Sequence, residues 1–214
     1  MNVTIFGAGK MAQAISTLLL SGGNNVTLLS RDSDKGAEAV KALSPHAKKG
    51  ATVKVAKLGS PIQDPVVINT IWFNSAVDIV TSYSKQLSGK ILVDITNPLN
   101  QTYDDLTTPP GSSAAEELAK IVPKDTKVLK AFNTTFAGLI SQGNIDGKPL
   151  DVFIAGDDAE AKATLAKLIE AGGQHAVDVG PLRFARQIEG LGLLLIVLQS
   201  KVKKPWMSSF KLLE

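Results

Sequence analysis

The chain opens with Val3-Thr4-Ile5-Phe6-Gly7-Ala8-Gly9-Lys10-Met11-Ala12, and this stretch predicts the fold. A short β-rich run is followed by two glycines one residue apart, and then by the apolar spacing of a helix face. The predicted order of strand, tight turn and helix suits a dinucleotide. Gly7 would make the turn, Gly9 would let the backbone approach the pyrophosphate, and Ala12 is the third small residue. Because glycine pairs also occur in ordinary loops, the flanking strand and helix are what favour a nucleotide site.

Length and composition indicate one ordinary globular domain. The chain has 214 residues with no Pro-, Gly- or Ser-rich linker, and its 23 basic and 20 acidic residues give no reason to expect nucleic acid. Cysteine is absent, which excludes disulfides, thiol nucleophiles and thiolate metal sites. The first strand begins at once, and the longest apolar run, residues 191–198, is too short to span a bilayer. We therefore expect a cytoplasmic protein with no membrane partner.

Strands and helices alternate along the chain. Strands are predicted at residues 26–30, 51–56, 65–71, 90–95, 127–132, 151–155 and 176–179, and helices at 33–43, 75–86, 159–171, 182–201 and from a capping-box pattern at 113–116. The strands are continuous Val/Ile/Leu runs, which are typical of a parallel sheet covered by helices on both faces. The predicted fold is a single doubly wound α/β domain over residues 1–214, with its ligand at the carboxyl ends of the strands.

The last predicted helix, residues 182–201, is apolar on most of its faces. It must be buried in the fold or against a second subunit, and we expect residues 182–214 to form a dimerisation and substrate segment of a homodimer. Arg186 and Glu189 lie one turn apart on this helix. We expect them to form an ion pair or to lie at the surface, with a role in shaping the second-substrate pocket as the alternative.

The end of the second strand, Ser30-Arg31-Asp32-Ser33-Asp34-Lys35, indicates the choice of cofactor. An acidic residue commonly bonds the ribose 2′-hydroxyl of NAD at this point, whereas the 2′-phosphate of NADP requires arginine and small polar donors. Arg31 offers a planar fork, Ser30 a hydroxyl, and Lys35 a point charge about one helical turn further on. We predict NADP as the cofactor, although Asp32 and Asp34 leave open a solvated helix start with an incidental arginine.

Apolar and aromatic residues follow the strand at 65–71. Ile71, Trp72 and Phe73 stand where side chains could wall the nicotinamide ring or the partner that receives its hydride. The alternative is that Trp72 and Phe73 only pack on the neighbouring helix.

Asparagines follow the next two strands at the same predicted edge. Asn97 is placed to bond the ribose or the carboxamide, and Pro98 fixes the chain as it leaves the sheet. Asn133 ends the following strand and allows the same interpretation. A plain strand-terminating turn is the alternative for both asparagines.

No motif predicts a metal site or a catalytic side chain. His46 and His175 belong to no recognisable constellation, and we expect both to be structural or solvated. There is no carboxylate and histidine cluster with metal-ligand spacing, and no G-x-S-x-G elbow of an esterase. We therefore expect no metal, and the catalytic residue is left unassigned.

Six short motifs follow one another along the chain: Gly7-Ala8-Gly9-Lys10-Met11-Ala12, Ser30-Arg31, Asp94-Ile95-Thr96-Asn97-Pro98-Leu99, Lys130-Ala131-Phe132-Asn133-Thr134, Ala155-Gly156-Asp157-Asp158 and Asp178-Val179-Gly180-Pro181-Leu182. Each motif alone is weak, but the ordered series is specific and extends nearly from end to end. In this order the motifs resemble the NADPH-dependent reductases of the deazaflavin coenzyme F-420, dinucleotide-binding proteins with a Rossmann fold. The same module also resembles the cytoplasmic domain of membrane ferric reductases.

The resemblance implies an NADP-dependent oxidoreductase that transfers a hydride between nicotinamide and a second small molecule. Such a transfer between two rings needs alignment and exclusion of water more than a side-chain acid. A deazaflavin, a flavin, a quinone, a ferric chelate or a small carbonyl compound are the acceptors left open. The competing interpretation is a non-catalytic NADP(H)-binding sensor or regulatory protein. By position, the resemblance implies cofactor contacts from Ala8, Gly9, Lys10, Met11, Ser30, Arg31, Lys35, Ile71, Trp72, Asn97 and Pro98.

Overall fold

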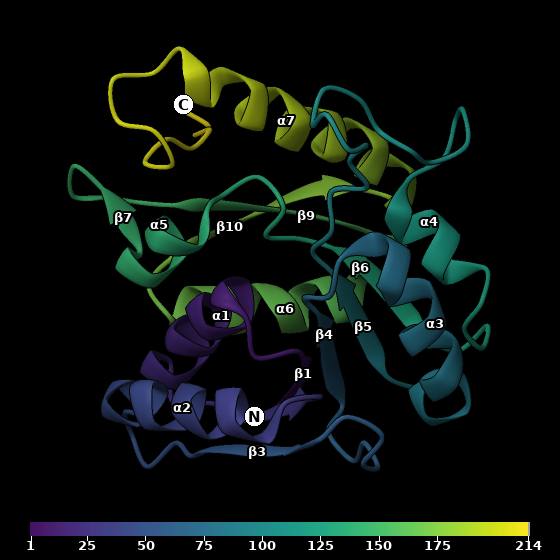
Figure 1. Cartoon of the computed structure of the whole chain (residues 1–214), viewed down its shortest axis with the longest axis vertical. Coiled ribbons are helices and arrows are strands. Elements are labelled where there is room, and N and C mark those ends of the chain that lie inside the picture. The colour runs from purple at the N-terminus through teal and green to yellow at the C-terminus, as the bar shows by residue number, and fades with distance from the viewer. Residues whose placement is uncertain (214) are drawn as a thin grey trace.

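An eight-stranded sheet forms the centre of the molecule (Figure 1). The structure is a computed structural model, and it describes residues 1–213. The strands follow the order β10-β9-β6-β5-β4-β1-β2-β3 across the sheet. Their bounds are β1 (Asn2–Phe6), β2 (Asn25–Ser30), β3 (Val53–Lys57), β4 (Val66–Asn69), β5 (Ile91–Asp94), β6 (Lys127–Lys130), β9 (Asp151–Gly156) and β10 (His175–Gly180).

The six strands from β1 to β6 run parallel, and the chain reverses its direction of winding between β1 and β4. This arrangement confirms the predicted doubly wound fold, in which a ligand crevice opens at the carboxyl ends beside the reversal. The sheet is mostly rather than wholly parallel, because β9 pairs with β6 in the antiparallel direction. β10 pairs with β9 in the parallel direction, so these two strands run opposite to the other six. Continuous apolar runs occur in buried strands of either direction, so the sequence pattern did not predict this change.

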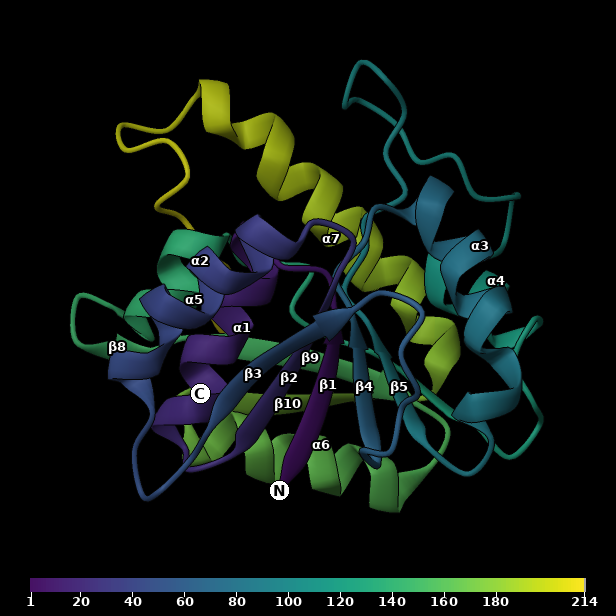
Figure 2. The ribbon, with the colours of Figure 1, turned by 60° about the horizontal axis from the view of Figure 1, so that its bottom comes forward.

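Helices cover both faces of the sheet (Figure 2). Separate apolar clusters form beneath the two layers of helices. The first layer holds α1 (Lys10–Ser21), α2 (Ser33–Leu43), α5 (Ala137–Gln142) and α6 (Ala159–Ala171). The second holds α3 (Phe73–Tyr83), α4 (Ala114–Ala119) and α7 (Ala185–Val197). Short 3₁₀ turns and a small hairpin complete the chain: Ser44–His46, Ser84–Leu87, Leu182–Phe184, Leu198–Ser200, β7 (Asn144–Ile145) and β8 (Lys148–Pro149).

Capping side chains explain where several helices begin. The Asp32 carboxylate accepts hydrogen bonds from the backbone of Asp34 and Lys35 at the start of α2, both at 3.0 Å. The Ser113 hydroxyl accepts from the Glu116 backbone at 3.2 Å, which confirms the predicted capping box at α4. Each cap satisfies amide groups that have no partner within the helix.

The last predicted helix is shorter than expected. Residues 182–201 form a 3₁₀ turn, α7, and a second 3₁₀ turn rather than one regular helix. Gly192 of α7 lies directly against Asn97, because a Cβ at Gly192 would approach the Asn97 Oδ1 atom to 2.6 Å. The absence of a side chain at Gly192 therefore lets α7 pack against the carboxyl edge of the sheet.

A buried ion cluster ties α7 to this edge. The Lys130 ammonium, at the end of β6, lies 2.7 Å from Asp94 Oδ2 and 2.7 Å from Glu189 Oε1, and all three side chains are 0% exposed. Asp94 is the register partner of Lys130 on β5, and it also accepts a 3.0 Å hydrogen bond from Asn69 on β4. Glu189 Oε2 accepts from the Ala114 backbone at the start of α4. The Lys130 ammonium thus joins β5 and β6 to α7, and Glu189 in turn joins α7 to α4.

Arg186 lies at the surface, as expected, but Glu189 does not, and the two residues form no ion pair with each other. Arg186 pairs with Glu116 of α4 instead, with its Nε and Nη2 atoms 2.9 and 2.6 Å from the two carboxylate oxygens. Glu189 is buried, and burial raises its carboxyl pKa more than the nearby Lys130 ammonium lowers it. Spacing along one helix gave no information about partners that come from β6 and α4.

Replacing Lys130 by methionine tests the importance of the cluster. We expect Lys130→Met to lower the free energy of unfolding by about 3–5 kcal/mol, because it leaves two buried carboxylates without their cation. Urea unfolding at neutral pH measures the change. Glu189→Gln is the matched control: it retains an acceptor for Ala114 and leaves Lys130 paired with Asp94, so its loss of stability should be much smaller. Equal losses in the two variants would contradict the role given to Lys130.

Candidate functional site

The glycine turn between β1 and α1 is built as the sequence predicts. Gly7 adopts a φ of +107°, and a Cβ there would lie 2.9 Å from the Thr70 hydroxyl oxygen. Gly9 precedes α1, no side chain caps the helix, and a Cβ at Gly9 would meet no atom within 4 Å. No side chain within residues 1–213 caps the first amides of α1, and uncapped amides at a helix start are the groups that bind phosphate.

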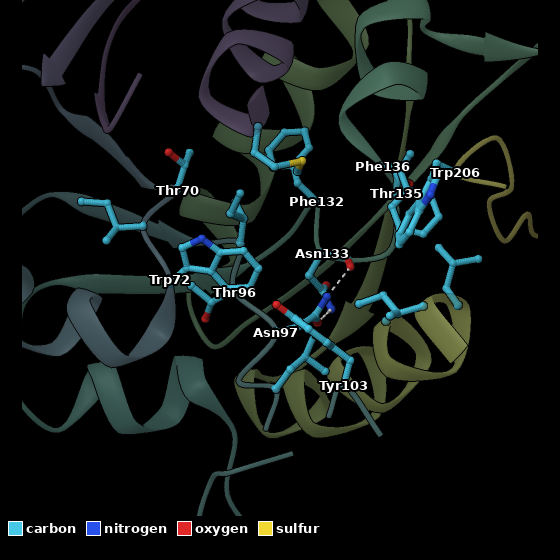
Figure 3. Close-up of a pocket in the computed structure, with 17 residues that line it drawn as sticks. Thr70, Trp72, Thr96, Asn97, Tyr103, Phe132, Asn133, Thr135, Phe136 and Trp206 are labelled. Atoms are coloured by element: carbon cyan, nitrogen blue, oxygen red, sulfur yellow. Dashed lines mark hydrogen bonds between the residues drawn. The ribbon is translucent and has the colours of Figure 1, made fainter. Parts of the chain in front are cut away.

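A cavity of about 470 Å³ lies at the carboxyl ends of β4, β5 and β6, between α1 and α7 (Figure 3). Five residues that the sequence predicted as cofactor contacts line this cavity, namely Met11, Ile71, Trp72, Asn97 and Asn133. They come from four separate segments of the chain. The fold thus brings together the predicted nicotinamide end of the site.

Aromatic side chains form much of the cavity wall. Trp72, which is 68% exposed, and Trp206 stand on opposite sides of the cavity, with Phe136 beside Trp206 (Figure 3). Tyr103 and Phe132 also line it. Trp206 packs edge-on against Phe136, with ring centroids 5.0 Å apart. None of the lining residues carries a charge. The wall suits a flat ring system and offers no ionised side chain as an acid or base.

Three of these aromatic residues have a strained backbone. Tyr103, Phe132 and Trp206 have φ angles of 58°, 63° and 64°. Bulky residues rarely adopt this left-handed conformation, and such strain tends to gather at functional sites. All three residues line the same cavity, so the strain supports its choice as the candidate site.

Two asparagines form a polar pair in this apolar cavity. The Asn97 amide donates to the Asn133 backbone oxygen at 2.9 Å, and the Asn133 amide donates to Asn97 Oδ1 at 2.8 Å and to the Ile188 backbone oxygen at 2.7 Å. The Asn133 Oδ1 atom is buried and has no hydrogen-bond partner within residues 1–213. A buried acceptor without a partner is costly, so this oxygen is suited to a ligand N–H or O–H group.

A second cavity, of about 410 Å³, lies at the ends of β2 and β3. Its lining includes Ser30 and Arg31, which the sequence predicted for the adenosine end of a dinucleotide. Asp32 is engaged elsewhere: its carboxylate caps α2, and the hydrogen bond from the Lys35 backbone holds its pKa below the usual value. The Asp32 carboxylate, which would otherwise be the acidic group for a ribose 2′-hydroxyl, thus caps α2 instead.

Outside the glycine turn, three of the predicted contacts line neither cavity. The Lys35 ammonium lies 3.8 Å from Asp32 Oδ2, and the Lys35 side chain is 78% exposed. Phe73 is the first residue of α3, and Pro98 is buried. These three residues lie near the site but line neither cavity, so their contacts with a cofactor stay predictions.

The sequence analysis missed much of the cavity. Lys57 lines the second cavity, and Tyr103, Phe136, Leu195 and Trp206 line the main one. Tyr103 lies in a long loop and Trp206 in the segment after α7, where no strand or helix pattern indicates their position. The only signal in the sequence for Tyr103 and Trp206 is that each is an aromatic residue in an otherwise polar segment.

Neither a metal centre nor a membrane segment is found among residues 1–213. No group of three or more His, Cys, Asp or Glu side chains in this range is placed to hold a metal ion. His175 Nδ1 lies 3.0 Å from Asp151 Oδ1 at the far edge of the sheet, and His46 lies in a 3₁₀ turn. No helix in the range has the length and apolar character needed to cross a bilayer.

Comparison with known families supports the resemblance drawn from the motifs. Residues 2–98 match the family described as NADP oxidoreductase, coenzyme F-420-dependent. A solved structure from Arthrobacter sp. FB24, provisionally described as an F-420-dependent NADP reductase, has 26% sequence identity and a TM-score of 0.79, with 95% of this chain and 96% of that chain covered. The predicted resemblance is thereby confirmed, and the matched family of NADP oxidoreductases agrees with the predicted cofactor.

Mammalian metalloreductases are also similar. The rat metalloreductase STEAP3 is 32% identical over 194 residues, which cover 91% of this chain and 37% of that protein. The human metalloreductase STEAP2 is 26% identical over 197 residues, which cover 92% of this chain and 36% of that protein. The chain thus spans little more than a third of the length of these relatives.

Alanine substitutions at the two glycines separate folding from cofactor binding. Gly7→Ala should lower the free energy of unfolding by about 1–3 kcal/mol, because the positive φ and the Thr70 contact both oppose a side chain. Gly9→Ala should change it by less than about 1 kcal/mol but weaken NADPH binding, since the methyl group would occupy the space that the pyrophosphate needs. Denaturant unfolding and NADPH titration measure the two effects. A Gly9→Ala variant that binds NADPH as well as the wild type would refute this placement of the phosphates.

Proposed function

We propose that this chain, whose residues 2–98 match the coenzyme F-420-dependent NADP oxidoreductases, transfers a hydride between nicotinamide and a flat, ring-shaped acceptor. The observation that carries this proposal is the uncharged aromatic cavity beside the glycine turn. When bound, the reduced nicotinamide supplies two electrons as a hydride. The acceptor takes that hydride with one proton from solvent, so no ionised side chain is required in the cavity.

The proposed path of the dinucleotide follows the carboxyl edge of the sheet. The adenosine end lies at Ser30 and Arg31, at the end of β2. The pyrophosphate lies over Ala8, Gly9 and Lys10, at the end of β1, and the nicotinamide end enters the cavity that begins at Met11. These positions are consecutive because β2, β1 and β4 are neighbours in the sheet.

The asparagine pair would orient the nicotinamide. Asn133 Oδ1 is the buried acceptor without a partner, and it would receive a hydrogen bond from the carboxamide N–H or a ribose hydroxyl. Asn97 holds Asn133 in place through two hydrogen bonds, and Gly192 packs against Asn97. A ring fixed in this way is aligned for transfer without a catalytic acid, since orientation alone lowers the barrier.

The aromatic wall supports a planar acceptor over a small carbonyl compound. Trp72, Tyr103 and Trp206 give broad apolar faces on which a flavin, a deazaflavin or a quinone ring can stack. Their partly exposed positions at the mouth leave the acceptor an entry route from solvent. Two ferric chelates with aromatic ligands would use the same faces in turn, each taking one of the two electrons while a proton is released to solvent.

We also propose a homodimer formed through α7. Leu194 and Val197 are exposed on this helix, and Met207 is exposed on the segment after it. Apolar side chains of this size at one end of a molecule are typical of a covered surface. A second copy placed there would lie beside the cavity, since Leu195 and Ile196 of the same helix line it.

An acceptor screen tests the proposed reaction. Purified protein and NADPH are mixed in turn with a flavin, a deazaflavin, a quinone, a ferric chelate and a small ketone, and loss of reduced-nicotinamide absorbance is followed. We expect turnover with one or more ring acceptors and none with the ketone. The Gly9→Ala variant serves as a control for oxidation that does not depend on bound NADPH. Tight NADPH binding without turnover of any acceptor would favour a sensor protein instead.

Measuring the mass in solution tests the dimer. At micromolar concentration the wild type should have the mass of two chains, and Leu194→Lys should have the mass of one, because a charge would be placed on the proposed interface. Leu194 is exposed in the single chain, so the substitution should leave the fold intact. Ala163→Lys, at an exposed position of α6, is the matched control and should remain dimeric. A monomeric wild type would contradict the proposal.

A further inference from the structure

We infer that Lys57, at the end of β3, is a specificity residue that binds the 2′-phosphate of NADP together with Arg31. The inference rests on the proposed position of the adenosine end beside β2. Lys57 belongs to none of the sequence motifs considered above, and it becomes relevant only through its place in the sheet.

The sheet register sets Lys57 beside Ser30. The two residues are paired across β2 and β3, both at the carboxyl ends of their strands. The Leu58 backbone donates to the Ser30 backbone oxygen at 2.8 Å, so the pairing continues one residue beyond β3. Paired residues on neighbouring strands lie about 5 Å apart and point to the same face. Lys57 therefore lines the second cavity together with Ser30 and Arg31.

The other predicted donors are already engaged. The Ser30 hydroxyl donates to the Asp32 backbone oxygen at 2.7 Å. The Lys35 ammonium faces the Asp32 carboxylate and lies outside the cavity lining. Arg31 and Lys57 are the two cationic residues in that lining, and neither forms an ion pair with a carboxylate of residues 1–213. These two side chains are the ones available to an incoming anion.

The packing of α2 fixes the shape of this cavity. Gly36 faces the sheet so closely that a Cβ there would lie 2.6 Å from Val55 Cγ2 and 3.2 Å from Ser30 Cβ. Because Gly36 faces the sheet, the adjacent Lys35 is turned away by about 100° around the helix. Helix geometry thus directs Lys35 toward solvent, while strand pairing directs Lys57 toward the space beside Arg31.

Two cations suit a phosphate monoester, which carries close to two negative charges at neutral pH. The arginine fork can bond two phosphate oxygens in a plane, and the lysine adds a compact charge from the neighbouring strand. A ribose 2′-hydroxyl would gain little from either cation. Lys57 should therefore increase the preference for NADPH over NADH rather than the affinity for both.

Dissociation constants for NADPH and NADH, measured by titration of the full chain, test the inference. Lys57→Ala should weaken NADPH binding on the order of tenfold, as for loss of a charge-assisted contact, and leave NADH binding unchanged. Arg31→Ala should behave in the same way with a larger effect. Lys54→Ala removes the same charge from an exposed position of the same strand that does not line the cavity, and should alter neither constant by more than about twofold.

The outcomes distinguish this inference from the proposed function. If Lys57→Ala behaves like Lys54→Ala while Arg31→Ala loses the preference for NADPH, Lys57 has no role but the phosphate position stands. A larger loss in Lys35→Ala than in Lys57→Ala would likewise overturn the inference in favour of Lys35. A wild type that binds NADPH and NADH equally would overturn both the inference and the proposed phosphate position. None of these results depends on finding the acceptor.

Discussion

The contact between the Lys130 ammonium and two buried carboxylates is the constraint on which the functional end of the molecule depends. Burial alone would favour the neutral amine, but Asp94 and Glu189 outweigh that effect and raise the pKa of Lys130. A charged group without water requires its partners at close range, because solvation cannot replace them. The carboxyl ends of β5 and β6 and the middle of α7 are therefore held at fixed positions relative to one another.

The cavity is a consequence of that arrangement. With α7 held at the sheet edge, Gly192 touches Asn97 and the Ile188 backbone oxygen receives a hydrogen bond from Asn133. The asparagine pair then leaves the buried Asn133 Oδ1 atom without a hydrogen-bond partner within residues 1–213. The strained backbones of Phe132 and Trp206 persist there because the surrounding packing determines them. The buried ion cluster of Lys130 and the strained backbone of the cavity wall thus shape the same site.

Local sequence patterns predicted much of the fold and part of the candidate site. The turn at Gly7 and Gly9, the cap at Ser113 and the helix at residues 159–171 each depend on a few neighbouring residues, and the structure has them where they were predicted. Lys130 and Glu189 show the opposite case. A lysine at the end of an apolar strand and a glutamate in an apolar helix have no local signal of pairing, because 58 intervening residues separate them along the chain.

The sequence by itself determined that a strand, a glycine turn and a helix begin the chain, and it predicted a cofactor with a 2′-phosphate. Both conclusions rest on backbone freedom and charge within short segments, which do not need the rest of the fold. The tertiary structure alone decided that Trp206 and Tyr103 wall the cavity, that Glu189 is buried, and that Lys57 stands beside Arg31. These placements depend on strand register and on helix packing between distant segments, and no local pattern encodes them.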